Sequence, residues 1–418
     1  MTSGAPQIMT FMTGNRYNQI MTIMFYLNQL GIICSLGNTH GEIKQNLFNA
    51  QSGVILSDQY SPGQMLPIGC LPEKYADLPD LSQKLPLRDR SRNNQLALSA
   101  LAQIRSAVDA AIEKYGTHRL GIIIGTSTSG IAEGEAALRH HAINNTFPEQ
   151  FHYGQQELGS PATALAFTSG ISGPAYSHSS ACASSGKAMA SAARLIKMGL
   201  CDAVITGGVD SLCEFTISGF SALESISHTR CNPLSLNRNG INIGEGAALF
   251  LMSKEPSEIA LRGWGESSDG YHISSPDPTG TGAKIAIQQA LLRADISTSQ
   301  IDYINLHGTA TPQNDAMESH VIYSLFGDNV PVSSTKSLTG HTLGAASAIE
   351  AGLCWLAMHS ENQSGLLPPH LWDGIADPAL PLLQTAKMNH TLGHSINWVL
   401  SNSFAFAGSN IALILGRS

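Results

Sequence analysis

The sequence predicts an α/β fold with a buried sheet, because apolar runs and helical patterns alternate along the chain and the same order begins twice. Apolar runs typical of buried strands cover 24–33, 120–125 and 203–207. Helical patterns lie between them, over 95–115 and after Cys182. On the first of these helices the apolar residues share one face, as a helix covering a sheet requires. These residues are Leu98, Leu101, Ile104, Val108 and Ile112.

A second α/β unit follows a polar connector at 253–257. Its expected elements are a helix over 282–294, a strand over 303–306, a helix that begins near Asn314 and a final strand that ends at Leu415. Two segments, 179–186 and 333–340, both lead from a polar turn into a helix of small residues, which indicates an internal repeat. We therefore expect two similar halves, 22–255 and 256–418.

The composition indicates a folded protein with much of its surface covered by a partner subunit. Of the 418 residues, 43% are hydrophobic and only 13% are charged, so a long solvated surface is not expected. The net charge of −8 gives no electrostatic attraction to nucleic acid or to an anionic membrane. No run reaches the roughly 20 apolar residues that span a bilayer. We expect a soluble protein.

Cysteine usage and the first residues bear on location. The seven cysteines are odd in number and never form a Cys-x-x-Cys pair, which favours a reducing compartment, the cytoplasm. Residues 1–21 lack the cationic start and continuous apolar stretch of a targeting signal. We expect this segment to be a disordered extension or the result of a misassigned start.

One cysteine, Cys182, occupies a position that favours reactivity. It lies where a polar turn enters a helix of small residues. Free backbone N–H groups and the helix dipole stabilise a thiolate at the first turn of a helix, and small neighbours admit a substrate. An isolated cysteine in such a helix is nevertheless more often an inert core residue. Whether Cys182 is reactive or inert therefore depends on the residues that surround it in the fold.

Three later stretches favour the reactive interpretation. His307 follows the end of an expected strand, where a side chain is well placed to face a cleft. Lys336 and His341 flank a further strand-to-helix turn. The last stretch, 402–410, is a tight aromatic turn that contains Phe406.

In this order the four stretches resemble the elongating β-ketoacyl-acyl carrier protein synthases of the thiolase superfamily, from about Met24 onward. The resemblance implies a thiolase fold, in which two similar halves form a layered αβαβα sandwich, and a dimer. Segments at 92–96, 125–130, 153–159 and 239–246 are most similar to the ketosynthases of bacterial aryl polyene biosynthesis. Those ketosynthases typically pair with a chain-length-factor subunit that lacks the cysteine.

The resemblance also implies a role for each residue of the site. Cys182 would accept an acyl chain from acyl carrier protein, and its N–H and that of Phe406 would form the oxyanion hole. His307 and His341 would donate hydrogen bonds to the malonyl thioester while carbon dioxide leaves. No cofactor is expected.

Supporting residues follow from the same resemblance. Lys336 and Glu318 would support the two histidines, although an ordinary buried ion pair is the simpler interpretation of both. Thr309 and Thr311 would bind the pantetheine arm of the carrier, although hydroxyls in such a turn also act as caps.

The expected gate between the cysteine and the acyl pocket is Phe406, and its neighbours depart from the family pattern. Ala405 and Ala407 replace two glycines of the usual Gly-Phe-Gly-Gly. Alanine resists backbone conformations that glycine adopts, so the loop is expected to be stiffer or differently shaped. This departure weakens the assignment of Phe406 to the oxyanion hole.

Five other functions are considered as alternatives. A general fatty-acid elongating ketosynthase fits the same residues. A non-catalytic chain-length-factor subunit would have lost Cys182, a synthase primed by acyl-coenzyme A would carry Asn in place of His341, and a thiolase would carry a cysteine after Cys354. A cysteine hydrolase would use Cys182 and His307 with Asn402.

A metal site is not expected. Only His390 and His394 have helical spacing among the candidate histidine ligands, but Gly393 lies between them and neither an acidic residue nor a cysteine follows Asp377.

Overall fold

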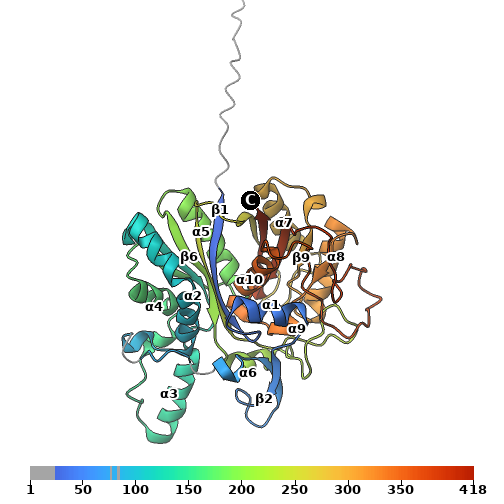
Figure 1. Cartoon of the computed structure of the whole chain (residues 1–418). Coiled ribbons are helices and arrows are strands. Elements are labelled where there is room, and N and C mark those ends of the chain that lie inside the picture. Colours follow the sequence, from blue (N-terminus) through green and yellow to red (C-terminus); the bar gives the residue numbers. More distant parts are fainter. Residues whose placement is uncertain (1–23, 76–77, 82–84) are drawn as a thin grey trace, which may run out of the picture.

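The computed structural model describes residues 24–75, 78–81 and 85–418, so the extension expected at 1–21 lies outside the described residues (Figure 1). Five strands from the first half of the chain lie side by side in the order β1-β7-β6-β4-β5. They are β1 (Phe25–Cys34), β4 (Leu120–Gly125), β5 (Ala175–His178), β6 (Ala203–Asp210) and β7 (Gly246–Ser253). Strand β4 runs parallel to β5 and β6, whereas β7 is antiparallel to β6 and β1.

The second half repeats this pattern strand for strand, in the order β8-β12-β11-β9-β10. Its strands are β8 (Ile259–Ser268), β9 (Tyr303–Asn305), β10 (Val332–Ser333), β11 (Trp398–Phe404) and β12 (Ser409–Arg417). Strand β9 runs parallel to β10 and β11, and β12 is antiparallel to β11 and β8. Pairing of Phe25 and Tyr26, the first residues of β1, with β8 joins the five-stranded sheets of the two halves into one ten-stranded sheet.

Helices form three layers around the two sheets (Figure 1). The first sheet is covered on its outer face by α2 (Arg92–Tyr115) and α4 (Ser160–Ser169), and the second by α7 (Thr281–Ala294) and α8 (Pro312–Phe326). Between the sheets lie α5 (Ser184–Lys197) and α10 (Ala346–Met358), whose apolar side chains pack with both sheets in one core cluster. The predicted layered α/β sandwich of two similar halves is confirmed.

The central helices show why small residues are needed there. Every residue of α10 is buried, as expected for a helix with sheets on both sides. A Cβ on Gly125 of β4 would lie 2.2 Å from the backbone nitrogen of Ser185, and one on Gly186 would lie 2.9 Å from Ile411. Small residues therefore let α5 approach the two sheets closely.

Several shorter elements were not predicted from the sequence. They are α1 (His40–Phe48), the hairpin β2 (Val54–Ser57) and β3 (Leu66–Gly69), α3 (Ile131–Asn144), α6 (Glu214–Ala222) and α9 (Lys336–Thr339). Helix α3 projects from the body of the molecule (Figure 1). Within the described residues, no helix is both long enough and apolar enough to cross a bilayer.

The division of the chain at residues 255 and 256 falls in the turn between β7 and β8. As a domain boundary it stays a prediction.

Candidate active site

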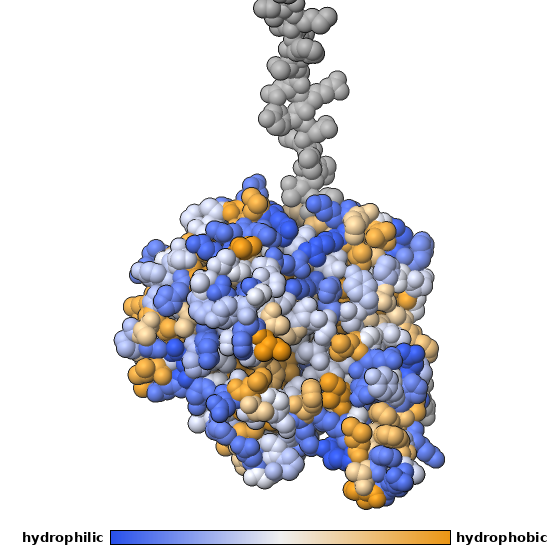
Figure 2. Space-filling view, turned by 180° about the vertical axis from the view of Figure 1, so that it is seen from behind, coloured by the Kyte–Doolittle hydropathy of each residue, from blue (hydrophilic) through white to orange (hydrophobic). Residues whose placement is uncertain are grey.

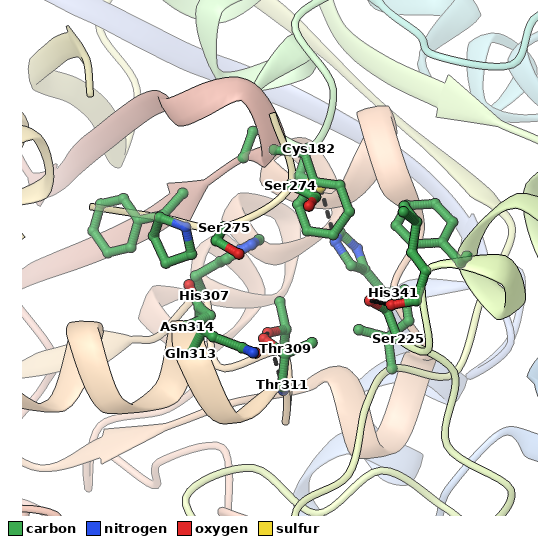
Figure 3. Close-up of a pocket in the computed structure, with 17 residues that line it drawn as sticks. Cys182, Ser225, Ser274, Ser275, His307, Thr309, Thr311, Gln313, Asn314 and His341 are labelled. Carbon is green, nitrogen blue, oxygen red and sulfur yellow. Dashed lines mark hydrogen bonds between the residues drawn. The ribbon is translucent and has the colours of Figure 1, made fainter. Parts of the chain in front are cut away.

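Residues from both halves converge on one buried thiol (Figure 3). Cys182 lies in the turn between β5 and α5 of the first half, whereas His307 follows β9 and His341 follows α9 of the second. The sulfur of Cys182 and a ring nitrogen of each histidine lie within 4.8 Å of one another, and all three residues are buried. The structure thus brings together the three residues that the sequence singled out as catalytic.

A cavity of about 90 Å³ connects this cluster to the surface. Buried Cys182 lines it together with Gln313, which is exposed, and with the partly buried Thr311. The hydroxyls of Thr309 and Thr311 lie 2.9 Å apart on the same wall (Figure 3). A flexible arm that carries a thioester can therefore reach the sulfur past two hydroxyl groups.

Burial dominates the electrostatics of Cys182. It raises the pKa of the thiol to about 12, although Lys336 and the backbone N–H groups of Phe406 and Cys182 itself act in the opposite direction. The helix start was expected to stabilise a thiolate, but α5 begins two residues later, at Ser184. That expectation is wrong for the resting site, where burial outweighs the nearby positive charge and N–H groups and the group is a thiol.

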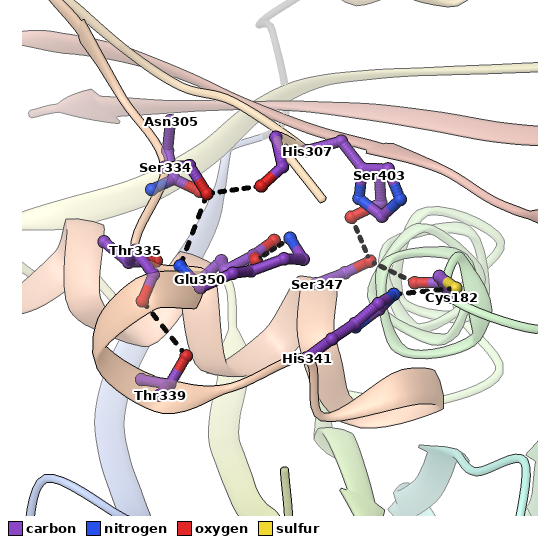
Figure 4. A network of polar contacts seen from close by, with 12 residues as sticks. Cys182, Asn305, His307, Ser334, Thr335, Thr339, His341, Ser347, Glu350 and Ser403 are labelled. Carbon is purple, nitrogen blue, oxygen red and sulfur yellow. Dashed lines mark hydrogen bonds and ion pairs between the residues drawn. The ribbon is translucent and has the colours of Figure 1, made fainter. Parts of the chain in front are cut away.

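His341 is fixed in one tautomer. Its Nδ1 accepts a hydrogen bond from the backbone N–H of Leu343 at 3.2 Å, so the ring proton is on Nε2. Nε2 lies 3.0 Å from Sγ of Cys182 (Figure 4). Burial and the nearby charge of Lys336 hold the pKa of His341 well below its usual value. The ring is therefore a neutral donor aimed at the sulfur.

His307 is held through its backbone. The carboxylate of Glu318 accepts the N–H of His307 at 2.8 Å and that of Gly308 at 2.7 Å. The His307 ring meets that of His341 edge to face, with centroids 5.4 Å apart. Burial, Lys336 and His341 lower its pKa far below the usual value, so it too is neutral. In the described structure its Nδ1 has no hydrogen-bond partner.

Family models match most of the chain. The N-terminal domain of β-ketoacyl synthase matches residues 31–257, and its C-terminal domain matches residues 259–371. The chain belongs to the β-ketoacyl synthase family. It is thus an acyltransferase with a thiolase fold, and the resemblance to elongating β-ketoacyl-acyl carrier protein synthases is confirmed.

Relatives and solved structures agree with this family. The chain is 31% identical to a putative mitochondrial 3-oxoacyl-[acyl-carrier-protein] synthase of Schizosaccharomyces pombe, over 92% of this chain and 96% of the relative. It is 29% identical to 3-oxoacyl-[acyl-carrier-protein] synthase 2 of Staphylococcus aureus, over 94% and 98%.

Two solved structures are also similar. One is a ketosynthase in complex with its chain length factor from Xenorhabdus doucetiae, which is 44% identical to this chain and has a TM-score of 0.87. The match covers 94% of this chain and 98% of the solved one. The other is the ishigamide ketosynthase/chain length factor, with 25% identity, 95% and 100% coverage, and a TM-score of 0.83.

In this β-ketoacyl synthase the buried ion pair differs from the one considered for the sequence. Lys336 pairs with Glu350 of α10, and both side chains are buried. Glu318 does not take part, because its two oxygens already accept the backbone N–H groups after β9. Burial raises the pKa of Glu318 and that of Glu350 to about 7, although the charge of Lys336 lowers both. Glu350 was missed, although a lone acidic residue in an apolar helix was a signal for it.

The loop after β11 places Phe406 at the cavity of the synthase. Its N–H lowers the pKa of the Cys182 thiol, which places that donor beside the sulfur. Ala405 is extended, with φ −91° and ψ 159°, so a glycine is not required there. Ala407 has φ 61°, in the left-handed region, where alanine is strained. Of the two alanines that replace glycines, only Ala407 is therefore strained, and the oxyanion-hole role of Phe406 stays a prediction.

Other buried polar residues of the synthase complete the site. Oγ of Ser347 lies 3.1 Å from the carbonyl oxygen of Cys182 and 2.7 Å from Oγ of Ser403, and its single proton can serve one of these two contacts (Figure 4). Asp210, at the end of β6, accepts hydrogen bonds from both halves of the molecule. Neither Ser347 nor Asp210 was predicted, because each acts through contacts between distant segments.

The alternatives find little support in the geometry. The amide nitrogen of Asn402 donates to Glu318 at 3.4 Å, and its Oδ1, which would accept the ring N–H of a histidine in a hydrolase, has no hydrogen-bond partner in the described structure. His390 and His394 lie on an irregular segment, so their helical spacing does not place them on one face of a helix. Among the described residues, the group with metal-ligand spacing is Cys182, His307 and His341 itself. The absence of a metal or cofactor stays a prediction.

Proposed function

We propose that this protein is an elongating ketosynthase that carries an acyl chain on Cys182 and joins it to a two-carbon unit from malonyl-acyl carrier protein. The observation that carries the proposal is the convergence of Cys182, His307 and His341 at the end of a cavity walled by Thr309 and Thr311.

In the first step Cys182 attacks the thioester carbonyl of acyl-acyl carrier protein. The thiol proton passes to the departing carrier thiol, and the acyl chain stays on the sulfur. The N–H groups of Cys182 and Phe406 stabilise the oxyanion; removal of one such donor typically costs on the order of 10² to 10³ in rate. The hydroxyls of Thr309 and Thr311 bind the pantetheine arm.

In the second step the malonyl thioester loses carbon dioxide. The electrons of the broken C–C bond form an enolate, whose carbon attacks the acyl carbonyl and expels the Cys182 thiolate, which is then reprotonated. His307 and His341 are neutral N–H donors. Each can stabilise the enolate oxygen by a hydrogen bond without transferring its proton. Lys336, 1% exposed, adds positive charge close to both rings.

Two variants separate the steps. Cys182→Ser should form no acyl-enzyme with acyl-acyl carrier protein, and His341→Ala should form it but fail to release a 3-oxoacyl product. Intact-mass spectrometry follows the first reaction, and product analysis follows the second. A covalent mass shift that persists in Cys182→Ser, or normal condensation by His341→Ala, contradicts the assignment.

We further propose that the chain it elongates is a polyene, of the aryl polyene type, and that the cytoplasmic enzyme works as a heterodimer with a chain-length-factor subunit. The similar ketosynthase from Xenorhabdus doucetiae was solved with its chain length factor, at 44% identity to this chain.

The surface supports a partner. Strand β5 is the last strand of its sheet and presents an unpaired edge. Apolar side chains gather on the projecting end of the molecule, at lower right in Figure 2. Leu138 and Ile143 of α3 and Phe147 beyond it are 62%, 83% and 52% exposed. Such a patch is typical of an interface.

The purified chain alone should elongate poorly or stop early, and addition of a chain-length-factor subunit should restore full-length product. Incubation with carrier protein charged with candidate acyl groups, followed by mass analysis, gives chain length and unsaturation. Full-length polyene from the homodimer would contradict the heterodimer. Preferred acylation of Cys182 by saturated over polyunsaturated acyl groups would favour a general fatty-acid ketosynthase.

A further inference from the structure

A buried carboxylate outside the reacting cluster joins the two halves of the molecule. Asp210 ends β6 and is fully buried. On the side of the first half it accepts the backbone N–H groups of Ser127 and Thr128, each at 2.9 Å. It also accepts the hydroxyls of Thr126, Ser127 and Thr128, at 2.6 to 2.8 Å. These bonds fix the turn that follows β4.

The remaining contact of Asp210 crosses to the second half. The backbone N–H of Gly344 donates to Oδ2 at 2.6 Å, and it also lies 3.2 Å from Oγ of Ser127. A Cβ at position 344 would lie 2.7 Å from Oδ2 of Asp210 and 2.7 Å from the backbone nitrogen of Ser127. Glycine is therefore required for this close approach.

Gly344 lies in the turn that controls His341. The preceding residue, Leu343, donates its N–H to Nδ1 of His341, and has φ 50°, in the left-handed region that leucine rarely adopts. A strained conformation persists only where surrounding contacts impose it. The N–H of Gly344, the residue after Leu343, donates to Asp210 and to Ser127, and these hydrogen bonds supply such a constraint.

We propose that Asp210 is a positioning residue for condensation: it holds the turn at 342–344 so that the Leu343 N–H keeps the His341 proton on Nε2. The proposal rests on the proposed function, in which that proton faces the developing enolate. Asp210 contacts neither the sulfur nor the cavity lining. It acts only through the backbone.

Asp210→Asn is the sharpest test, because every contact of the carboxylate comes from an N–H or O–H group. An amide has the same shape, but its NH₂ must face at least one backbone N–H in either orientation. Condensation should fall on the order of 10- to 100-fold, the size of effect that small misplacements produce. Acylation of Cys182 should change less than about threefold.

Two further variants grade the effect. Ser127→Ala removes the hydroxyl that binds both Asp210 and Gly344, and should lower condensation in the same direction by a few-fold. Thr128→Val is the matched control, because it removes one bond to Asp210 on the side away from Gly344 and should leave condensation within twofold. Ser127→Ala keeps the proposal testable if Asp210→Asn does not fold.

The tautomer of His341 is read directly from ¹⁵N chemical shifts of histidine-labelled protein, with the signal assigned by its loss in His341→Ala. Wild-type protein should carry the proton on Nε2, and Asp210→Asn or Ser127→Ala should shift population to Nδ1–H. A wild-type Nδ1–H tautomer, or variants with unchanged shifts and unchanged condensation, would overturn the proposal.

Failure of the proposed function looks different. If His341→Ala condenses normally, the role of the ring in catalysis is wrong, whereas the tautomer shifts still decide whether Asp210 controls the ring.

Discussion

The two halves of the molecule share one strand order, yet the turns at equivalent strand ends carry different chemistry. After β4 the first half places the hydroxyls of 126–128, whereas after β9 the second half places His307. After β5 comes Cys182, and after β10 comes Lys336. The first half thus supplies one reactive sulfur in a frame of hydroxyl groups, and the second supplies the imidazoles and the buried charge.

Each half stabilises its own turn with a buried carboxylate. Asp210 accepts the backbone N–H groups of Ser127 and Thr128 in the first half, and Glu318 accepts those of His307 and Gly308 in the second. A duplicated fold can keep this way of holding a turn while the exposed side chain changes. The polar groups of the two halves should therefore differ in their effect on the free energy of unfolding, because buried ionisable groups destabilise a fold more than hydroxyls do.

The largest difference between the halves, measured as a loss in the free energy of unfolding, should appear when one partner of an ion pair is removed. Lys336→Met leaves Glu350 alone in the core of the second half, and should lower the free energy of unfolding by about 3–5 kcal/mol. Lys114→Met, in the first half, breaks a pair with Glu255 that is about half exposed, and should leave the free energy of unfolding nearly unchanged. Urea unfolding measures both.

Glu350→Gln added to Lys336→Met should recover part of the loss, because it removes the unpaired charge. Equal stability of the two lysine variants would show that the buried pair of the second half has no special cost.

The next difference concerns pH. Burial raises the pKa of Glu318 from 4.5 to about 7, so between these values the native state binds more protons than the unfolded state. The free energy of unfolding should therefore fall as pH rises from 5 to 7, by up to about 1.4 kcal/mol per pH unit for this group. Glu318→Gln should flatten that slope in urea unfolding series.

Glu361→Gln is the control. The Lys44 ammonium holds the pKa of this exposed carboxyl below 4.5, so it titrates outside the window and the slope should not change. An unchanged slope in Glu318→Gln would mean that Glu318 is ionised throughout.

Local patterns in the sequence predicted an α/β fold with a buried sheet and the turns that hold Cys182 and His307, whereas the layered sandwich followed from the resemblance to ketosynthases. The apolar runs that alternate with helical patterns fall on β1, β4 and β6. The turns with Cys182 and His307 each follow a strand. A strand end sends its next side chain to the edge of a sheet, where sites form. This information lies within a few neighbouring residues.

The supporting contacts could not be predicted in the same way. Lys336 could be assigned to Glu318 or to Glu350 only once α10 was placed between the sheets. Asp210 ends an apolar strand and meets Gly344, 134 residues away in the chain. Such contacts depend on how the two halves pack together. Neither hydrophobic periodicity nor turn composition predicts which distant residues meet.

The smallest expected difference concerns strained backbone, which both halves contain. Ser129 of the first half has φ 47° and donates its N–H to Thr126, whereas Ala407 of the gate loop has φ 61° and donates to the carbonyl oxygen of Ile273. Left-handed alanine costs about 1 kcal/mol or more, and glycine removes that cost at the expense of a more disordered unfolded chain. Ala407→Gly should therefore be neutral or slightly stabilising.

Ala405→Gly is its matched partner, because φ of −91° suits alanine and glycine gains nothing there. It should lower the free energy of unfolding by about 0.5–1 kcal/mol, leaving the two variants about 1 kcal/mol apart. If the left-handed alanine also limits motion of the loop around Phe406, Ala407→Gly alone should change the rate of Cys182 acylation, by a few-fold at most. Identical stability and acylation rates in the two variants would show that the strain at Ala407 neither costs stability nor controls the gate.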